Sequence, residues 1–124
     1  MSPRALSPGG LLLLLAGCDT LTGRVCTAEA VSGITVHVRD SLTGRPAGFG
    51  SSVVATDGAF AETLQFLGAI DSLTFFGVFE RPGHYMVDVS RPGYRRWERQ
   101  DVRVEQGPCH VIPVVLDVRL QPES

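Results

Sequence analysis

The sequence ITVHVRD at residues 34–40 decides the fold, because apolar and polar side chains alternate over a whole strand length. Ile34, Val36 and Val38 share one face, and the polar side chains between them share the other. This two-residue period is typical of a β-strand with one buried face. Turn-forming residues follow at 41–46, SLTGRP. We therefore expect a strand here that ends in a turn.

Strand signals separated by turns continue along the chain. Asp57-Gly58 is the strongest hairpin signal, since this pair favours the tight turn that joins two antiparallel strands. Residues 67–74 are expected to form a loop or a short helical turn, and no longer amphipathic helix is evident. Seven short strands predict an all-β sandwich. The expected strands cover residues 33–40, 51–56, 59–66, 75–79, 84–90, 94–105 and 109–120.

Two breaks in the alternation predict local irregularities. Trp97 is out of register with Val102 and Val104, so a bulge near residues 98–101 is expected to restore the inward face. Pro113 has no N–H to donate to a sheet, which favours an edge position or a break in the last strand.

The period also predicts which side chains are buried. Glu62 shares a face with Leu64 and Phe66, so it must lie near the rim or edge of a sheet. The inner face of the last strand is expected to consist of Ile112, Val114, Leu116, Val118 and Leu120.

Length and charge narrow the class of protein. The 124 residues suffice for one domain, and 11 basic residues face 13 acidic ones. Proteins that bind nucleic acids need a strong basic excess. No nucleic-acid partner is therefore expected.

The leader indicates export. Its apolar run, residues 11–16, is far shorter than the roughly 20 residues that a transmembrane helix needs, and resembles the core of a signal peptide. LAGC at residues 15–18 resembles the bacterial lipobox. That resemblance implies cleavage before Cys18, acyl chains on this cysteine and a location in the bacterial cell envelope. The alternative is an ordinary signal peptide followed by a coincidental cysteine.

The two other cysteines form an even pair. Cys26 and Cys109 lie near opposite ends of the mature chain, and export exposes them to an oxidising compartment. A bond between them would close a loop of about 84 residues and contribute about 4–5 kcal/mol. Two free thiols or a metal pair are the alternatives, but neighbouring ligands at metal-binding spacing are lacking. We therefore predict a Cys26–Cys109 disulfide.

Five motifs together resemble the carboxypeptidase regulatory-like domain. They are ITVHVRD at 34–40, TGRPA at 43–47, DGAF at 57–60, GHYMVDV at 83–89 and PGY at 92–94. The resemblance implies a seven-stranded transthyretin-like (prealbumin-like) β-sandwich of Greek-key type. Because that family consists mostly of non-catalytic modules, it also implies a binding or structural role. The expected division is a lipoprotein signal peptide at 1–17, a lipidated N-terminus and tether at 18–32, the sandwich at 33–120 and a tail at 121–124.

A hydrolase is a more distant alternative on the same fold. HVRD at 37–40 and HVIP at 110–113 resemble parts of 5-hydroxyisourate hydrolase, in which two histidines could act as acid and base. However, Ala59 follows Asp57-Gly58 where that enzyme has an arginine, and the enzyme's Tyr-Arg-Gly-Ser tail is missing. We expect no catalytic residues.

Metal binding is not expected either. No two of His37, His84 and His110 stand at the spacing that places ligands together on a strand or helix. We predict neither a metal nor a cofactor.

One run of residues is a possible ligand surface. Trp97 stands among Arg95, Arg96 and Arg99, which suits an acidic partner or a sugar ring, whereas Tyr85 and Tyr94 are expected in the core. The alternative is a solvated strand face, because acidic residues are interleaved with the arginines.

These features predict a lipid-anchored envelope protein whose non-enzymatic sandwich acts as a binding or structural module. Its expected partners are the membrane, through the anchor, and an envelope protein or glycan. Carbohydrate binding of the starch-binding type is the alternative. A tether over residues 19–26 spans at most about 25–30 Å.

Overall fold

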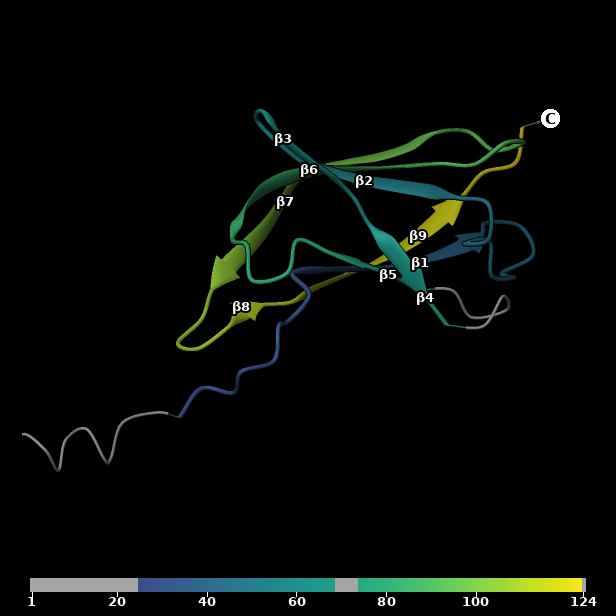
Figure 1. Cartoon of the computed structure of the whole chain (residues 1–124). Coiled ribbons are helices and arrows are strands. Elements are labelled where there is room, and N and C mark those ends of the chain that lie inside the picture. Colours follow the sequence, from purple (N-terminus) through teal and green to yellow (C-terminus); the bar gives the residue numbers. More distant parts are fainter. Residues whose placement is uncertain (1–24, 69–73, 124) are drawn as a thin grey trace, which may run out of the picture.

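The computed structural model describes residues 25–68 and 74–123, which form nine strands and no helix (Figure 1). The expected signal peptide and Cys18 lie outside these residues, as does most of the 67–74 segment. Within the described ranges, no helix is long and apolar enough to cross a membrane. The strands are β1 (Ile34–Asp40), β2 (Ser52–Asp57), β3 (Phe60–Thr63), β4 (Gln65–Leu67), β5 (Thr74–Gly77), β6 (Gly83–Ser90), β7 (Trp97–Gln106), β8 (Val111–Ile112) and β9 (Val114–Leu120).

The strands form two sheets, which confirms an all-β, two-sheet architecture (Figure 1). One sheet has the order β4-β5-β1-β9, and the other has the order β3-β2-β6-β7-β8. β1 and β9 are parallel, with Ile34 opposite Val114 and Asp40 opposite Leu120. The other pairs are antiparallel.

Two of the seven expected strands are each divided, which accounts for nine described strands. The 59–66 stretch changes sheets at Leu64, whose N–H donates to the Val53 carbonyl at 2.8 Å. The last expected strand breaks at Pro113, so that β8 pairs with β7 whereas β9 pairs with β1. The predicted break at Pro113 is therefore confirmed, and its missing N–H gives the physical reason.

A single apolar core lies between the two sheets. The alternation predicted for β1 and β6 is confirmed, since their inward residues are all buried. The prediction for Ile112 is wrong: its side chain is 52% exposed, and Val111 is buried instead. Because the chain changes sheets at Pro113, the period of β9 cannot be extended backwards into β8. The least exposed side chains of the core include those of Tyr85, Phe75, Ile34, Leu120, Val36, Val53, Val87, Val89 and Val118.

The predicted bulge in β7 is confirmed. Tyr85 pairs with Val102 and Val87 with Arg99, so Gln100 and Asp101 together lie opposite the single residue between the two β6 positions. Asp101 has φ 58°, a left-handed conformation. The extra residue in β7 shifts the alternation by one position, so that Val102 faces the core, where it is buried.

Glu62 lies on β3, an outer strand, as predicted from its polar side chain. Its Oε2 accepts a hydrogen bond from the Val78 N–H at 2.9 Å, which connects this edge with the end of the other sheet. Gly77 lets the Leu64 and Glu62 side chains pack directly against its backbone, because a Cβ at this position would lie 2.6 Å from Leu64 Cγ and 2.7 Å from Glu62 Oε2.

Candidate functional site

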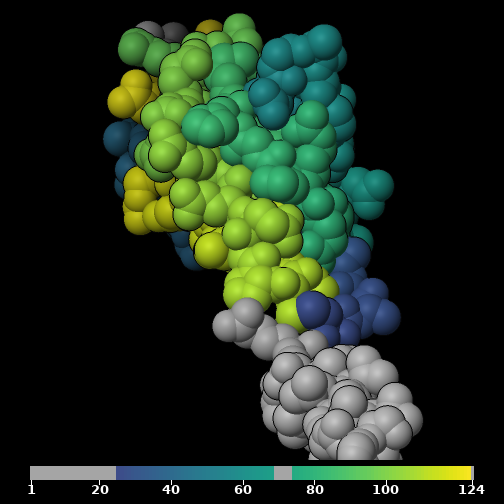
Figure 2. Space-filling model, turned by 90° about the vertical axis from the view of Figure 1, so that its left-hand side faces the viewer, coloured from purple at the N-terminus to yellow at the C-terminus, as the bar shows by residue number. Residues whose placement is uncertain are grey.

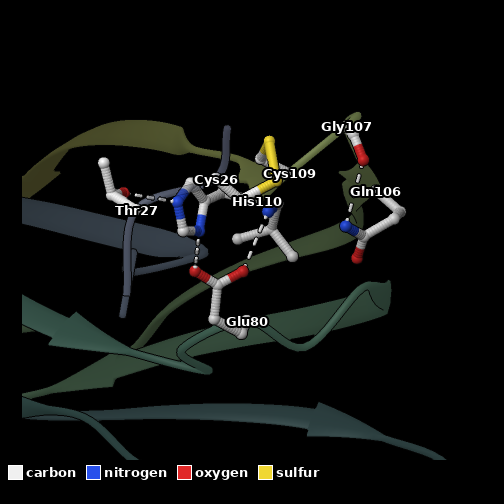
Figure 3. Close-up of a disulfide and its surroundings, with 8 residues drawn as sticks. Cys26, Thr27, Glu80, Gln106, Gly107, Cys109 and His110 are labelled. Carbon is white, nitrogen blue, oxygen red and sulfur yellow. Dashed lines mark hydrogen bonds and ion pairs between the residues drawn. A yellow bond between two sulfur atoms is a disulfide. The ribbon is translucent and has the colours of Figure 1, made fainter. Parts of the chain in front are cut away.

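The N-terminal lead-in is fastened to one end of the sandwich by a disulfide. Cys26 and Cys109 are bonded with their Cα atoms 5.2 Å apart and 83 positions apart in sequence, which confirms the predicted pair (Figure 3). Figure 2 shows the blue residues that open the described chain packed against the yellow-green region around β8. We call this part of the molecule the disulfide end.

Glu80 is the centre of the hydrogen bonds at the disulfide end (Figure 3). Its carboxylate accepts from the Val31 N–H at 2.9 Å, the Val111 N–H at 3.1 Å and His110 Nδ1 at 2.5 Å. Desolvation alone would raise the pKa of Glu80, but these hydrogen bonds and the charge interaction with His110 outweigh it and lower the pKa below its ordinary 4.5. Glu80 thus joins the lead-in to the strand that follows Cys109.

His110 completes this junction. Its Nε2 lies 2.8 Å from the Thr27 hydroxyl, so the ring bridges the lead-in and Glu80. The sequence analysis considered His110 for catalysis and for metal binding and expected neither role. The neighbouring Cys109 was the only signal for a structural role, because nothing local places Glu80 beside His110.

The three histidines have separate partners and do not meet in one site. His37 Nδ1 lies 3.4 Å from the Thr74 hydroxyl, and His84 Nδ1 lies 3.6 Å from Asp101 Oδ1. No group of three His, Cys, Asp or Glu side chains within residues 25–68 and 74–123 is arranged to hold a metal ion.

Three of the four residues suggested as a ligand surface line one hollow of about 260 Å³. Arg95 and Arg96 precede β7 and Trp97 begins it, and Arg119 of β9 and Gln121 just beyond it complete the lining. We call these five residues the arginine pocket. The sequence did not predict that Arg119 and Gln121 belong to this surface, because only the packing of β9 beside the start of β7 brings them into the arginine pocket.

A backbone hydrogen bond connects the two walls of the arginine pocket. The Arg95 N–H donates to the Gln121 carbonyl at 2.8 Å. Next to it, the Tyr94 hydroxyl donates to Asp40 Oδ2 at 2.7 Å. This bond and backbone N–H groups of the following turn lower the pKa of Asp40, and the same bond, with burial, raises the pKa of Tyr94. Tyr94 packs against the core as expected, and Tyr85 is buried there.

The arginines differ in how firmly they are held. Arg96 makes two hydrogen bonds to Asp88, at 3.0 and 3.3 Å, and a 3.1 Å ion pair with Glu98. Arg119 Nε lies 3.7 Å from Asp117, and both side chains are exposed. Within the described part of the chain, the Arg95 side chain makes no hydrogen bond or ion pair.

Arg99, also predicted for the ligand surface, does not line the pocket. Its guanidinium lies over the Trp97 ring, 5.2 Å from the centroid. Trp97 is partly buried and packs against the core. One face of the indole is therefore covered by a side chain of the protein itself.

The arginine pocket and the disulfide end lie near opposite ends of β7. Strand β7 begins with Trp97 in the pocket and ends at Gln106, which pairs with Val111 close to Cys109. At about 3.3 Å per residue, the nine steps between Trp97 and Gln106 span roughly 30 Å.

A second, more open hollow of about 480 Å³ lies at the bulge. Thr56, His84, Met86, Gln100 and Asp101 are among its lining residues. The described surface also exposes the aromatic side chains of Phe49, Phe66 and Phe79. Flanking Gly48 and Gly50 were an available signal for the exposure of Phe49. The prediction that Phe66 shares the inward face of Leu64 is wrong, because the chain changes sheets at Leu64 and the period of β3 does not extend into β4.

No protein-family model matches this chain, and a search of curated proteins finds no match either. The family resemblance therefore stays a prediction from the sequence motifs.

Proposed function

We propose that this protein is a lipid-anchored module of the bacterial cell envelope that binds a partner through the arginine pocket and catalyses no reaction. The lipobox-like LAGC at residues 15–18 supports the anchor. The Cys26–Cys109 disulfide agrees with an oxidising compartment outside the cytoplasm.

The finer fold proposal is the transthyretin-like sandwich of carboxypeptidase regulatory-like domains. Seven expected strands correspond to nine described ones, with two strands divided where the chain passes between sheets. The five sequence motifs support the family. A module of this kind supplies a scaffold, so its function must be argued from the surface.

The observation that carries the proposal is the convergence of Arg95, Arg96 and Trp97 with Arg119 in one hollow. Since the chain enters the domain at the disulfide end, a lipid on Cys18 would place the pocket on the side away from the membrane. A partner held there can be a component of the envelope beyond the anchoring membrane.

Carbohydrate binding is the second candidate, supported by Trp97 in the wall of the hollow. A hydrolase has less support, because the three histidines contact different partners.

The proposal is tested in a bacterium that exports the full chain. We expect the wild type in the membrane fraction and Cys18→Ser in the soluble envelope fraction. A photoreactive residue at Gln121 should give an envelope cross-link, whereas the same group at Glu105, an exposed position near the other end of β7, should not. Equal fractionation of both proteins, or the same cross-links from both positions, would contradict it.

A further inference from the structure

We infer that the arginine pocket binds the carboxylate of a sugar acid within an acidic glycan. This rests on the proposed function and specifies the ligand of the same site. The guanidinium groups of the arginines can pair with the carboxylate, and the Trp97 indole and the Gln121 amide can contact the sugar ring. The pocket also lies on the side of the domain where a ligand away from the anchoring membrane can reach it.

The pocket offers two arginines that can turn towards a ligand. The Arg95 side chain has no hydrogen-bond or ion-pair partner in the described part of the chain. Arg119 has one ion-pair partner, Asp117, but the pair is long, at 3.7 Å, and exposed, so it is weak in water. A guanidinium presents two parallel N–H donors that match a carboxylate. Arg95 and Arg119 are therefore the groups that bind the anion.

Arg96 has a different role in the pocket. Its hydrogen bonds to Asp88, which is only 16% exposed, fix the guanidinium and leave little freedom to follow a ligand. The carboxylates that pair with Arg96 and Arg119 are those of Asp88, Glu98 and Asp117, and none of them lines the hollow. Its charged lining residues are all arginines, which attract an anion.

The remaining lining selects a sugar acid over a bare anion. Trp97 adds an apolar wall and Gln121 adds an amide that can both donate and accept, neither of which an isolated inorganic anion uses. A volume of about 260 Å³ lies just below the roughly 300–1,000 Å³ of pockets for drug-sized molecules, so it suits one small unit of a chain.

The same geometry argues against a neutral sugar that stacks on the indole. Arg99 already covers one face of the Trp97 ring, and three of the five lining residues are arginines. Recognition must then depend on charge, and because the arginines are exposed it must weaken as salt increases.

The position of the pocket disfavours headgroups of the anchoring membrane. The hollow lies roughly 30 Å along β7 from the end at which the chain enters the domain. A lipid-anchored chain would present it outward, where glycans are accessible.

The test measures binding of the purified, oxidised Cys18→Ser chain, which cannot carry the proposed acyl chains and so cannot bind vesicles through them, to an oligogalacturonate. The same oligomer with its carboxylates reduced to alcohols, inorganic phosphate, and vesicles of phosphatidylglycerol serve as comparison ligands. Arg95→Gln with Arg119→Gln removes both proposed anion-binding groups. Arg103→Gln is the matched control, since this exposed arginine of β7 lies opposite His84, away from the pocket.

We expect the uronate to bind, the reduced oligomer to bind at least about tenfold more weakly, and the double variant to lose at least about tenfold in affinity while Arg103→Gln stays within about twofold. Equal binding of the reduced oligomer would overturn the inference and favour carbohydrate binding, the second candidate function. Tighter binding of phosphate or of the vesicles would also overturn it. Absence of binding in every arm would overturn the sugar-acid inference alone, because the Gln121 cross-link tests the module's function separately.

Discussion

His110 Nδ1 donates a 2.5 Å hydrogen bond to Glu80 Oε2, while the other ring nitrogen lies 2.8 Å from the Thr27 hydroxyl. One side chain thereby joins the lead-in, the turn after β5 and the start of β8. The disulfide beside it fixes the same segments covalently. The end of the domain nearest the proposed anchor is therefore held by both kinds of bond.

Replacing Glu80 by Gln should lower the free energy of unfolding at neutral pH. The same change should make that free energy vary less as the pH falls into the acid range. Because the folded-state pKa of Glu80 is lowered, its contribution is fully present above the unfolded value near 4.5 and is lost as the pH falls through the lower folded value. Urea unfolding at pH 7 and at pH 3 should show a gap between wild type and variant that narrows in acid. Glu105→Gln, at an exposed position, is the control. A gap that persists unchanged in acid would refute the role of the charge.

Loss of the Cys26–Cys109 bond should lower the free energy of unfolding by about 4–5 kcal/mol, because the unfolded chain is freed of a loop closed across 83 positions. Denaturant unfolding of the oxidised protein and of Cys26→Ser with Cys109→Ser measures this difference. Thiol titration of the denatured wild type should find neither cysteine free. Equal unfolding midpoints would mean that the bond does not stabilise the domain.

Asp101 should tolerate glycine but not valine, because its φ of 58° suits glycine and strains a β-branched residue. We expect Asp101→Val to cost about 1–2 kcal/mol and Asp101→Gly to be nearly neutral. Loss of the exposed pair with His84 is common to both variants and contributes little. Thermal unfolding compares them with Arg103→Val on the same strand. Equal destabilisation by glycine and valine would argue against backbone strain at the bulge.

Truncation of Phe75 should cost more stability than truncation of Phe66, because the first ring is buried and the second lies at the surface. Phe75 is 1% exposed and Phe66 is 46% exposed, and their rings meet edge to face with centroids 5.5 Å apart. We expect Phe75→Ala to cost about 3–5 kcal/mol, against about 0.5–1.5 kcal/mol for the ring contact that Phe66→Ala removes. Urea unfolding with the disulfide intact measures both. Similar losses would mean that Phe75 does not anchor the core.

Local signals in the sequence were enough to predict much of the fold. The alternation in residues 34–40 identified β1, the parity of Trp97 and Val102 located the bulge, and the missing N–H of Pro113 located the break. Each of these depends on neighbours along the chain. The disulfide also followed, since only one pair remained once Cys18 was assigned to the lipid.

What could not be predicted depends on contacts between distant segments. The sequence identified Arg95, Arg96 and Trp97, but not that Arg119 and Gln121 would join them across β7 and β9. It likewise gave no reason to place Glu80 beside His110. Ile112 was misplaced for the same reason, because a change of sheet at the following proline resets which face is inward.

Anchoring through Cys18 is tested most directly by mass spectrometry of the protein isolated from bacterial membranes. We expect a chain that begins at Cys18 and carries the added mass of a diacylglyceryl group, with or without a further acyl chain on its amine. An unmodified N-terminus at any other residue would contradict the anchor, and with it the outward orientation of the arginine pocket.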